Sequence, residues 1–309
     1  MLAAPSAAVS SLEPRGAPLN PTAVLSPLGL VRLLQCVSSC IALSLVVHDG
    51  GWTGAAGHFC MFAWGFCLAL SSLVLCFEFT RLHDCLSLSW SNLTVSSALL
   101  AALLELTAAV IFPLYFVRLE CQECRSRDFR ISASVCSAVA CVAYGAEVHL
   151  TRARPGHLAG YMSTTPGLLK VVQAYVACLI FGALYSGSES GRYPATQWCV
   201  AVYALCFLLA VLVIGLNVSG RAAAVHWPLE RAVVLHTFLA TLLYLSASIV
   251  WPIYCFDREY GSMERPANCR WGHCPWDNQV IVATFTYVNL ALYVSDLVFS
   301  QRLLYVARA

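Results

Sequence analysis

Residues 29–35, GLVRLLQ, decide the plan of this chain, because they return 138 residues later as residues 167–173, GLLKVVQ. Each copy runs on to a cysteine, Cys40 in the first and Cys178 in the second. An offset of 139 residues recurs at three further landmarks: Cys60 with Cys199, Cys67 with Cys206, and 113–115, PLY, with 252–254, PIY. A repeat of this length predicts a tandem duplication of one domain rather than a short solenoid unit.

The composition is that of a membrane protein. Hydrophobic residues make up 59% and charged residues 11% of the 309 positions, and the mean hydropathy is +0.72. Soluble domains carry about 25% charged residues. A net charge of +2 provides no basic field for nucleic acid. We therefore expect membrane lipids, and no nucleic acid, as partners.

The N-terminal residues 1–26 are rich in Ala, Ser and Pro, with one acid, Glu13, and one base, Arg15. This composition predicts a disordered tail. The segment lacks the charged start and the continuous apolar run of a secretory signal. The first membrane span is therefore expected from Leu28 onward.

Eight apolar runs are long enough to cross a bilayer, which takes about 20 residues in a helix. They are residues 28–47, 58–79, 93–117 and 131–150 in the first copy, and 168–185, 198–216, 232–251 and 280–299 in the second. The runs are too long for barrel strands and lack their two-residue alternation. The predicted fold class is an all-α polytopic membrane protein with two tandem four-helix bundles, at residues 27–155 and 156–309.

Orientation follows from the cysteines better than from the charges. Ten of the 18 Lys and Arg residues fall on the side of the termini, which is too small a margin to decide. If the termini are cytosolic, five cysteines fall in or beside the two long outer loops, where disulfides form: Cys121, Cys124, Cys255, Cys269 and Cys274. We expect cytosolic termini and a structural bridge of Cys269 with Cys274, or of either with Cys255. The lone CxxC at 121–124 is weak support for a metal, and none is expected.

Charged residues inside spans mark functional sites by default, because each is costly in the bilayer. Glu105 is central in the third span, and its counterpart in the second copy is Tyr244. A proton or ion relay needs several such groups along a path, and this span offers one. We expect Glu105 to be protonated or hydrogen-bonded within the bundle rather than to transport ions.

Four further charges lie at matching depths near the cytosolic ends of spans. Arg32 and Lys170 lie one turn into the first helix of each copy, and Glu147 and Asp296 lie about one turn inside the end of the last helix. One hypothesis is an intramembrane ion pair in each copy, Arg32 with Glu147 and Lys170 with Asp296. The alternative is that each side chain snorkels separately to the headgroups.

Two kinds of modification signal occur at the cytosolic face. The sequons at Asn92 and Asn217 both lie at the edge of a span on that face, so we expect neither to carry sugar. Cys85 follows the second span by a few residues and is a candidate for palmitoylation. An unmodified thiol is the alternative at Cys85.

Small residues recur on the third and seventh spans, where they permit close helix approach. The positions are Ser97, Ala101, Ala108, Thr241 and Ser248. If these faces are lateral surfaces, then Ala101→Leu or Ser248→Leu should change self-association.

The four-span unit, with a short first outer turn, a longer second outer loop and a Pro and a Tyr near the end of the third span, resembles a MARVEL domain. Seven motifs resemble the myeloid-associated differentiation marker family: 27–30 PLGL, 52–54 WTG, 140–144 ACVAY, 151–156 TRARPG, 160–162 GYM, 166–170 PGLLK and 198–203 WCVAVY. The resemblance implies two MARVEL domains, cytosolic termini and residence in cholesterol-rich membrane or vesicles. It implies no catalytic residues.

The sequence shows no nucleophile constellation, phosphate loop or histidine-rich metal spacing, so we expect neither an enzyme nor a cofactor. The function predicted is a scaffold that organises or links membrane, at the plasma membrane or on vesicles, acting through lipids, unidentified lateral partners or a homo-oligomer. The alternative is a small-solute or ion channel or transporter. Each copy has an even number of spans, so the copies lie parallel, unlike those of inverted-repeat carriers.

Overall fold

The computed structural model describes residues 20–50, 52–117, 124–152, 160–187, 191–221, 229–267, 269 and 274–306. Its elements are α1 (Pro21–Leu25), α2 (Pro27–Asp49), α3 (Gly54–Phe79), η1 (Leu82–Cys85), α4 (Trp90–Phe116), α5 (Cys124–Thr151), η2 (Tyr161–Ser163), α6 (Thr165–Tyr185), α7 (Pro194–Val218), α8 (Leu229–Phe256) and α9 (Pro275–Val306). Eight of them, α2 to α9, are long and apolar enough to cross a membrane. The predicted all-α fold with eight spans is confirmed.

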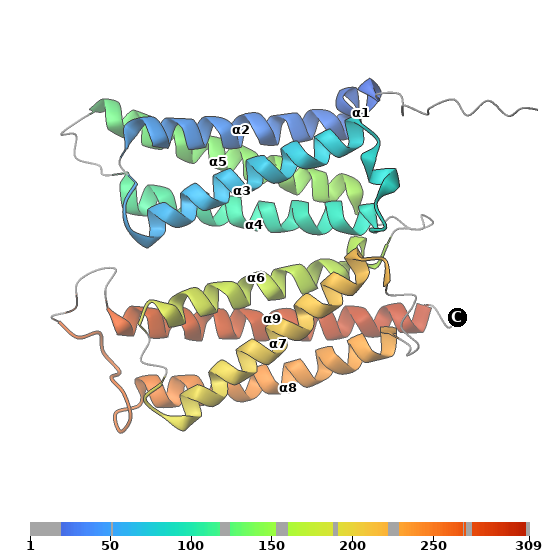
Figure 1. Ribbon diagram of the computed structural model, residues 1–309. Helices are drawn as coiled ribbons and strands as arrows, with labels where there is room; N and C mark the ends of the chain where they lie inside the picture. The colour runs from blue at the N-terminus through green and yellow to red at the C-terminus, as the bar shows by residue number, and fades with distance from the viewer. Residues whose placement is uncertain are drawn as a thin grey trace, which may run out of the picture.

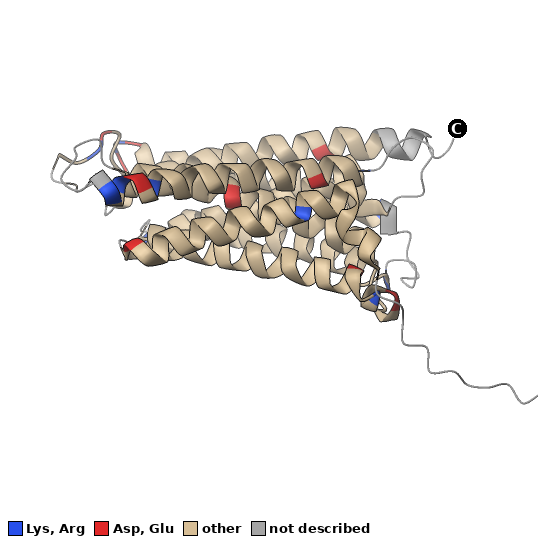
Figure 2. Ribbon diagram, turned by 90° about the horizontal axis from the view of Figure 1, so that it is seen from above, with Lys and Arg blue, Asp and Glu red and all other residues tan. Residues whose placement is uncertain are grey.

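The helices form two bundles, α1 to α5 and α6 to α9, one beside the other (Figure 1). In each bundle the last span packs against the first and third spans, α5 against α2 and α4, and α9 against α6 and α8. We call the side with the start of α2 the terminal side and the side with residues 257–267 the loop side. Charged residues gather at these two ends, with only a few along the helices (Figure 2).

Each bundle has its own core. Trp64 and Phe112 meet edge to face at 5.1 Å in the first core, and Tyr203 and Trp251 lie 6.4 Å apart in the second. Such aromatic pairs contribute about 0.5–1.5 kcal/mol beyond the area that they bury. The two cores lie at equivalent places in the repeat, so the duplication extends to the packing.

The glycine that opens each repeated segment is required by a close approach of the backbone. A Cβ on Gly29 would meet the carbonyl oxygen of Ala23 in α1 at 2.2 Å, and one on Gly167 would meet that of Tyr161 in η2 at 2.3 Å. Ser26 caps α2 by accepting from the Gly29 N–H at 3.0 Å. A short helix therefore folds back on the first span of each copy.

The start of the first bundle differs from the expected disordered tail. Pro21–Leu25 is helical, and the Asn20 N–H donates to the Phe79 carbonyl at 2.8 Å, which ties this segment to the end of α3. Residues 1–19 lie outside the described residues. Proline at the first helical position favours this short helix, because its missing N–H would have no partner there in any case.

Asn92 joins the two bundles at the terminal side. Its Nδ2 donates to the carbonyl of Asn217 at 3.0 Å, and its Oδ1 accepts from the Met162 N–H at 3.2 Å. The side chains of Asn92 and Asn217, the two sequon asparagines, are both buried. The Asn92 side chain and the Asn217 carbonyl form the junction, whereas the Asn217 side chain donates to the Val213 carbonyl of its own helix at 2.8 Å. In the folded protein neither side chain is exposed to a glycosylating enzyme.

The expectation that Ala101 and Ser248 form lateral surfaces is wrong. Both are buried inside their bundles, as are Ala108 and the neighbouring Ala247. Their small size lets α4 and α8 approach the other helices of the same bundle. Replacing Ala101 or Ser248 by Leu would overpack a core rather than widen a face that lipid or a second protein contacts.

Candidate functional site

The first bundle buries a salt bridge between its first and last helices. The Arg32 Nε in α2 lies 2.6 Å from Oε1 of Glu147 in α5, and Arg32 is only 1% exposed. The Gln35 Nε2 donates to the other oxygen, Oε2, at 2.8 Å. Arg32 and Gln35 are three residues apart, so one face of α2 holds both oxygens of the carboxylate.

The second bundle repeats this arrangement with other residues. The Lys170 Nζ in α6 lies 2.7 Å from Oδ2 of Asp296 in α9, and both residues are 0% exposed. Gln173 donates to Oδ2 at 3.0 Å, and Ser300 donates to Oδ1 at 3.0 Å. Lys170 also donates to Thr237 of α8 at 2.7 Å, so the pair links three helices.

The four charges that the sequence places at matching depths are thus brought together in two pairs. Their burial leaves no room for separate snorkelling, since a snorkelling side chain keeps its charged end in the headgroup region. A buried charge whose partner is removed costs about 3–5 kcal/mol. The pairs therefore fix which helix lies beside which.

Glu78 is a member of the first network that the sequence analysis missed. Its carboxylate pairs with Arg32, and its other oxygen accepts from the Trp90 Nε1 at 3.1 Å. Its counterpart at the 139-residue offset is Asn217, which carries no charge. The signal was an acid in the last turn of the second span, at the depth of Arg32. A guanidinium can serve two carboxylates, whereas the ammonium of Lys170 is a compact charge.

Glu105 lies at the centre of a second, deeper network. It is 0% exposed, and its two carboxyl oxygens accept from Ser39 of α2 at 2.8 Å and Ser137 of α5 at 2.7 Å. Ser137 in turn accepts from the Trp64 Nε1 of α3 at 3.0 Å. All four spans of the bundle therefore meet at this carboxyl group, which is hydrogen-bonded as expected from the sequence.

The second bundle fills the equivalent space with neutral groups. Tyr203 bonds Thr286 at 2.8 Å, and Asn289 donates to Tyr244, the counterpart of Glu105, at 2.8 Å. These residues come from α7, α8 and α9. Asn289 also donates to the Gln173 carbonyl of α6 at 3.3 Å. A polar link among four helices is kept, although the acid is not.

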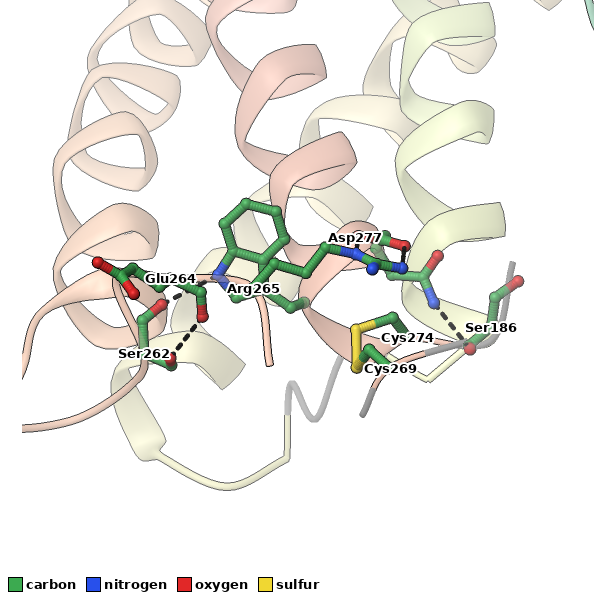
Figure 3. Close-up of a disulfide and its surroundings, with 9 residues drawn as sticks. Ser186, Ser262, Glu264, Arg265, Cys269, Cys274 and Asp277 are labelled. Atoms are coloured by element: carbon green, nitrogen blue, oxygen red, sulfur yellow. Dashed lines mark hydrogen bonds and ion pairs between the residues drawn. A yellow bond between two sulfur atoms is a disulfide. The ribbon is translucent and has the colours of Figure 1, made fainter. Parts of the chain in front are cut away.

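On the loop side of the second bundle, residues 257–267 and 269 lead from α8 toward α9, and we call this segment the cap. A disulfide stabilises it. Cys269 and Cys274 are bonded, with their Cα atoms 5.3 Å apart, just before α9 begins (Figure 3). Arg265 donates to both oxygens of Asp277 at 2.8 and 3.0 Å. The hydrogen bond to Asp277 raises the pKa of the Arg265 guanidinium above its ordinary value. The segment before the disulfide is thus fastened to the first turn of α9.

The other cysteines stand apart from this bond. Cys255 is buried in the core of the second bundle and does not take part in the disulfide. Cys121 and the side chain of Cys124 lie outside the described residues. Cys85 is exposed in η1 at the terminal side, and its acylation stays a prediction. Over the described part of the chain, no three His, Cys, Asp or Glu residues are grouped to hold a metal ion.

An open pocket of about 340 Å³ lies beside the cap, between the starts of α7 and α9 and the end of α8. Tyr193, Tyr260 and Trp276 form much of its wall, and the Tyr193 hydroxyl donates to the Tyr260 carbonyl at 3.0 Å. Tyr193 and Tyr260 lie 5.9 Å apart, edge to face. The rings of Tyr193 and Tyr260 therefore pack on each other, and the Trp276 ring packs on Phe256 of α8 at 5.9 Å.

Two tandem bundles that pair their buried charges internally define a multi-pass membrane protein. Residues 23–150 and 161–299 each match the model of MARVEL, a membrane-associating domain. Myeloid-associated differentiation marker-like protein 2 of Homo sapiens is 57% identical over 302 residues, which cover 96% of this chain and 98% of that protein. The protein of that name from Xenopus laevis is 52% identical over 296 residues, covering 95% and 98%.

A more distant relative is the myeloid-associated differentiation marker of Homo sapiens, 43% identical over 294 residues that cover 93% of this chain and 91% of that protein. No solved structure gives a significant match. The chain belongs to the MARVEL family, in the group of the myeloid-associated differentiation markers. The resemblance found in the sequence is confirmed.

The two ion pairs should respond differently to charge reversal. Combining Lys170→Asp with Asp296→Lys should restore much of the stability that either change removes, because the pair is re-formed in the opposite sense. Combining Arg32→Glu with Glu147→Arg should restore less, because Glu78 would then face a second carboxylate. The measurement is the thermal unfolding midpoint in detergent for each single and double variant.

Adding Glu78→Gln to the first-bundle exchange is the matched control, and it should bring recovery closer to that of the second bundle. Independent snorkelling would instead give additive losses in both bundles, with no recovery in either exchange.

Proposed function

We propose that this protein is a non-enzymatic scaffold that organises or links membrane, through its lipid-facing surfaces and lateral partners. The observation that carries the proposal is the internal pairing of Arg32, Glu147, Lys170 and Asp296. Because these charged side chains bond to one another, they hold the helices together and do not line a path for a solute. We therefore propose that the charged groups within the spans serve assembly of the bundles.

The outer faces of the spans support this reading. Val142, Leu208 and Leu114 are among the many large apolar side chains exposed along the helices. In a bilayer these side chains contact lipid tails, and span length can match the local bilayer thickness. We propose that membrane lipids, including those of cholesterol-rich domains, and unidentified membrane proteins or a second copy are the partners of these faces.

A channel or transporter is the second candidate, and Glu105 is the observation that favours it. An acid at the centre of a span is the usual mark of an ion or proton path. Its described partners, Ser39 and Ser137, belong to the same bundle, and the equivalent network of the second bundle is neutral. A path that used both copies would lack an acid at the position of Tyr244, the counterpart of Glu105.

Ion flux separates the two candidates. Purified protein in liposomes should leave the vesicles as tight to K⁺, Na⁺ and H⁺ as empty ones, and Glu105→Gln should change nothing, because the scaffold has no conducting path. Flux is followed with ion-sensitive dyes trapped inside the vesicles. Conduction that Glu105→Gln abolishes would replace the scaffold by a transporter.

We also propose that the termini face the cytosol and that the protein resides in the plasma membrane or in vesicles. The Cys269–Cys274 disulfide lies at the loop side, and disulfides persist in oxidising compartments. The basic link between the bundles, with Arg152 and Arg154, would then lie on the cytosolic side. Residues 27–155 and 156–309 are proposed as the two domains that the link joins.

Thiol labelling tests this orientation. In intact cells an impermeant maleimide should label Glu259→Cys, in the exposed loop-side segment, and should not label Ala153→Cys, in the link. Both variants should react after permeabilisation, which is the control for access. Labelling of Ala153→Cys from outside would invert the topology.

A further inference from the structure

An apolar groove of about 560 Å³ lies between the two bundles, walled by α4, α6 and α9. It runs along α6 from Tyr175, in the middle of the span, to Ser186, at the loop-side end. In Figure 1, α4 and α6 lie close at the terminal side and diverge toward the loop side. The groove occupies this diverging part.

The junction residues explain why the bundles separate in this direction. Asn92 and η2 join them at the terminal side, and the hydroxyl groups of Thr107 and Tyr175 bond at 2.5 Å in the middle of the spans. Beyond Tyr175, α6 continues with the small Gly182 and Ala183. A Cβ on Gly182 would meet nothing within 4 Å, so the groove stays open there.

The lining fits hydrocarbon. Leu106 and Val110 of α4 are 50% and 51% exposed, and Ile281 of α9 is 41% exposed. The hydroxyl groups at the deep end are bonded to each other. At the rim, Asn278 donates to the Ser186 carbonyl at 2.9 Å. The groove is therefore apolar along its length and polar at the membrane surface.

Its length matches one leaflet. Ser186 lies 11 residues beyond Tyr175, a rise of about 16 Å at 1.5 Å per residue, which is close to half of a hydrocarbon core of about 30 Å. A transmembrane helix of a second copy would cross both leaflets.

We propose that the groove between the bundles holds one lipid of the loop-side leaflet, with an acyl chain along Gly182 toward Tyr175 and the polar head at Ser186 and Asn278. Lipid tails are the only solvent at this depth. The volume lies within the roughly 300–1,000 Å³ of ligand sites. A chain in the groove completes the contact between two bundles that otherwise touch mainly toward the terminal side.

The proposal deepens the scaffold function, on which it rests, by naming a lipid that the protein holds. The scaffold function and the lipid site can be refuted independently of each other. Conduction of ions would refute the scaffold and leave the groove filled, whereas an empty groove would leave the ion-tight scaffold in place.

Photo-crosslinking tests the site in the full chain. The protein is reconstituted in phosphatidylcholine vesicles that contain a trace of phosphatidylcholine with a diazirine on one acyl chain, and adducts are mapped by mass spectrometry. A diazirine near the chain end should label the region of Thr107 and Tyr175, and one near the ester should label the region of Gly182. Labelling in the groove should exceed that of the other lipid-facing helix surfaces.

Gly182→Leu should remove the excess labelling, because the new side chain projects into the groove. Gly65→Leu is the matched control, since a Cβ on Gly65 also meets nothing within 4 Å and the residue lies on α3, away from the groove. It should leave the labelling unchanged. If Gly182→Leu does not fold, Val110→Trp fills the groove from α4 instead.

Two results would overturn the proposal. They are uniform labelling of all exposed span faces, and groove labelling that persists in both filling variants.

Discussion

In each bundle a cation in the first span is neutralised by a carboxylate in the last span, and the rest of the structure depends on this pairing. Neither member can be left alone in a bilayer, because an unpaired charge there costs several kcal/mol. Arg32 with Glu147 and Lys170 with Asp296 thus close each bundle. Between apolar helices in lipid there is little hydrophobic drive for association, so packing and polar links such as these carry more of the specificity.

Both copies keep an ion pair between the first and last spans, but the residues around it differ. The glycine, the cation and the glutamine stay three residues apart in both copies, with a short helix folded back on the glycine. Around this constant element the first bundle adds Glu78 and the buried Glu105, whereas the second uses Thr237 and Tyr244. The role of the deeper acid is therefore met by neutral hydrogen bonds in the other copy, which is consistent with an assembly function.

The spans could be predicted from the sequence because length and apolarity are one-dimensional signals. Matching depth offered the ion pairs as one of two alternatives, the other being separate snorkelling. The direction in which a residue faces could not be predicted. In soluble proteins the apolar face of a helix identifies the core, but lipid is as apolar as a bundle interior, so Ala101 and Ser248 gave no sign that they are buried. The contact of Glu78 with Arg32 and the junction at Asn92 depend on how α3, α4 and α7 pack, which no local pattern records.

A double-mutant cycle at the fully buried pair tests the central claim most directly. The unfolding free energy is measured in mixed micelles for the wild type, Lys170→Met, Asp296→Leu and the double variant. The account predicts that each single change costs about 3–5 kcal/mol, because it leaves a buried charge alone. The double variant should cost far less than the sum of the two single changes, because it leaves no buried charge without a partner. Additive losses would show that the two side chains act independently and that ion pairs do not close the bundles.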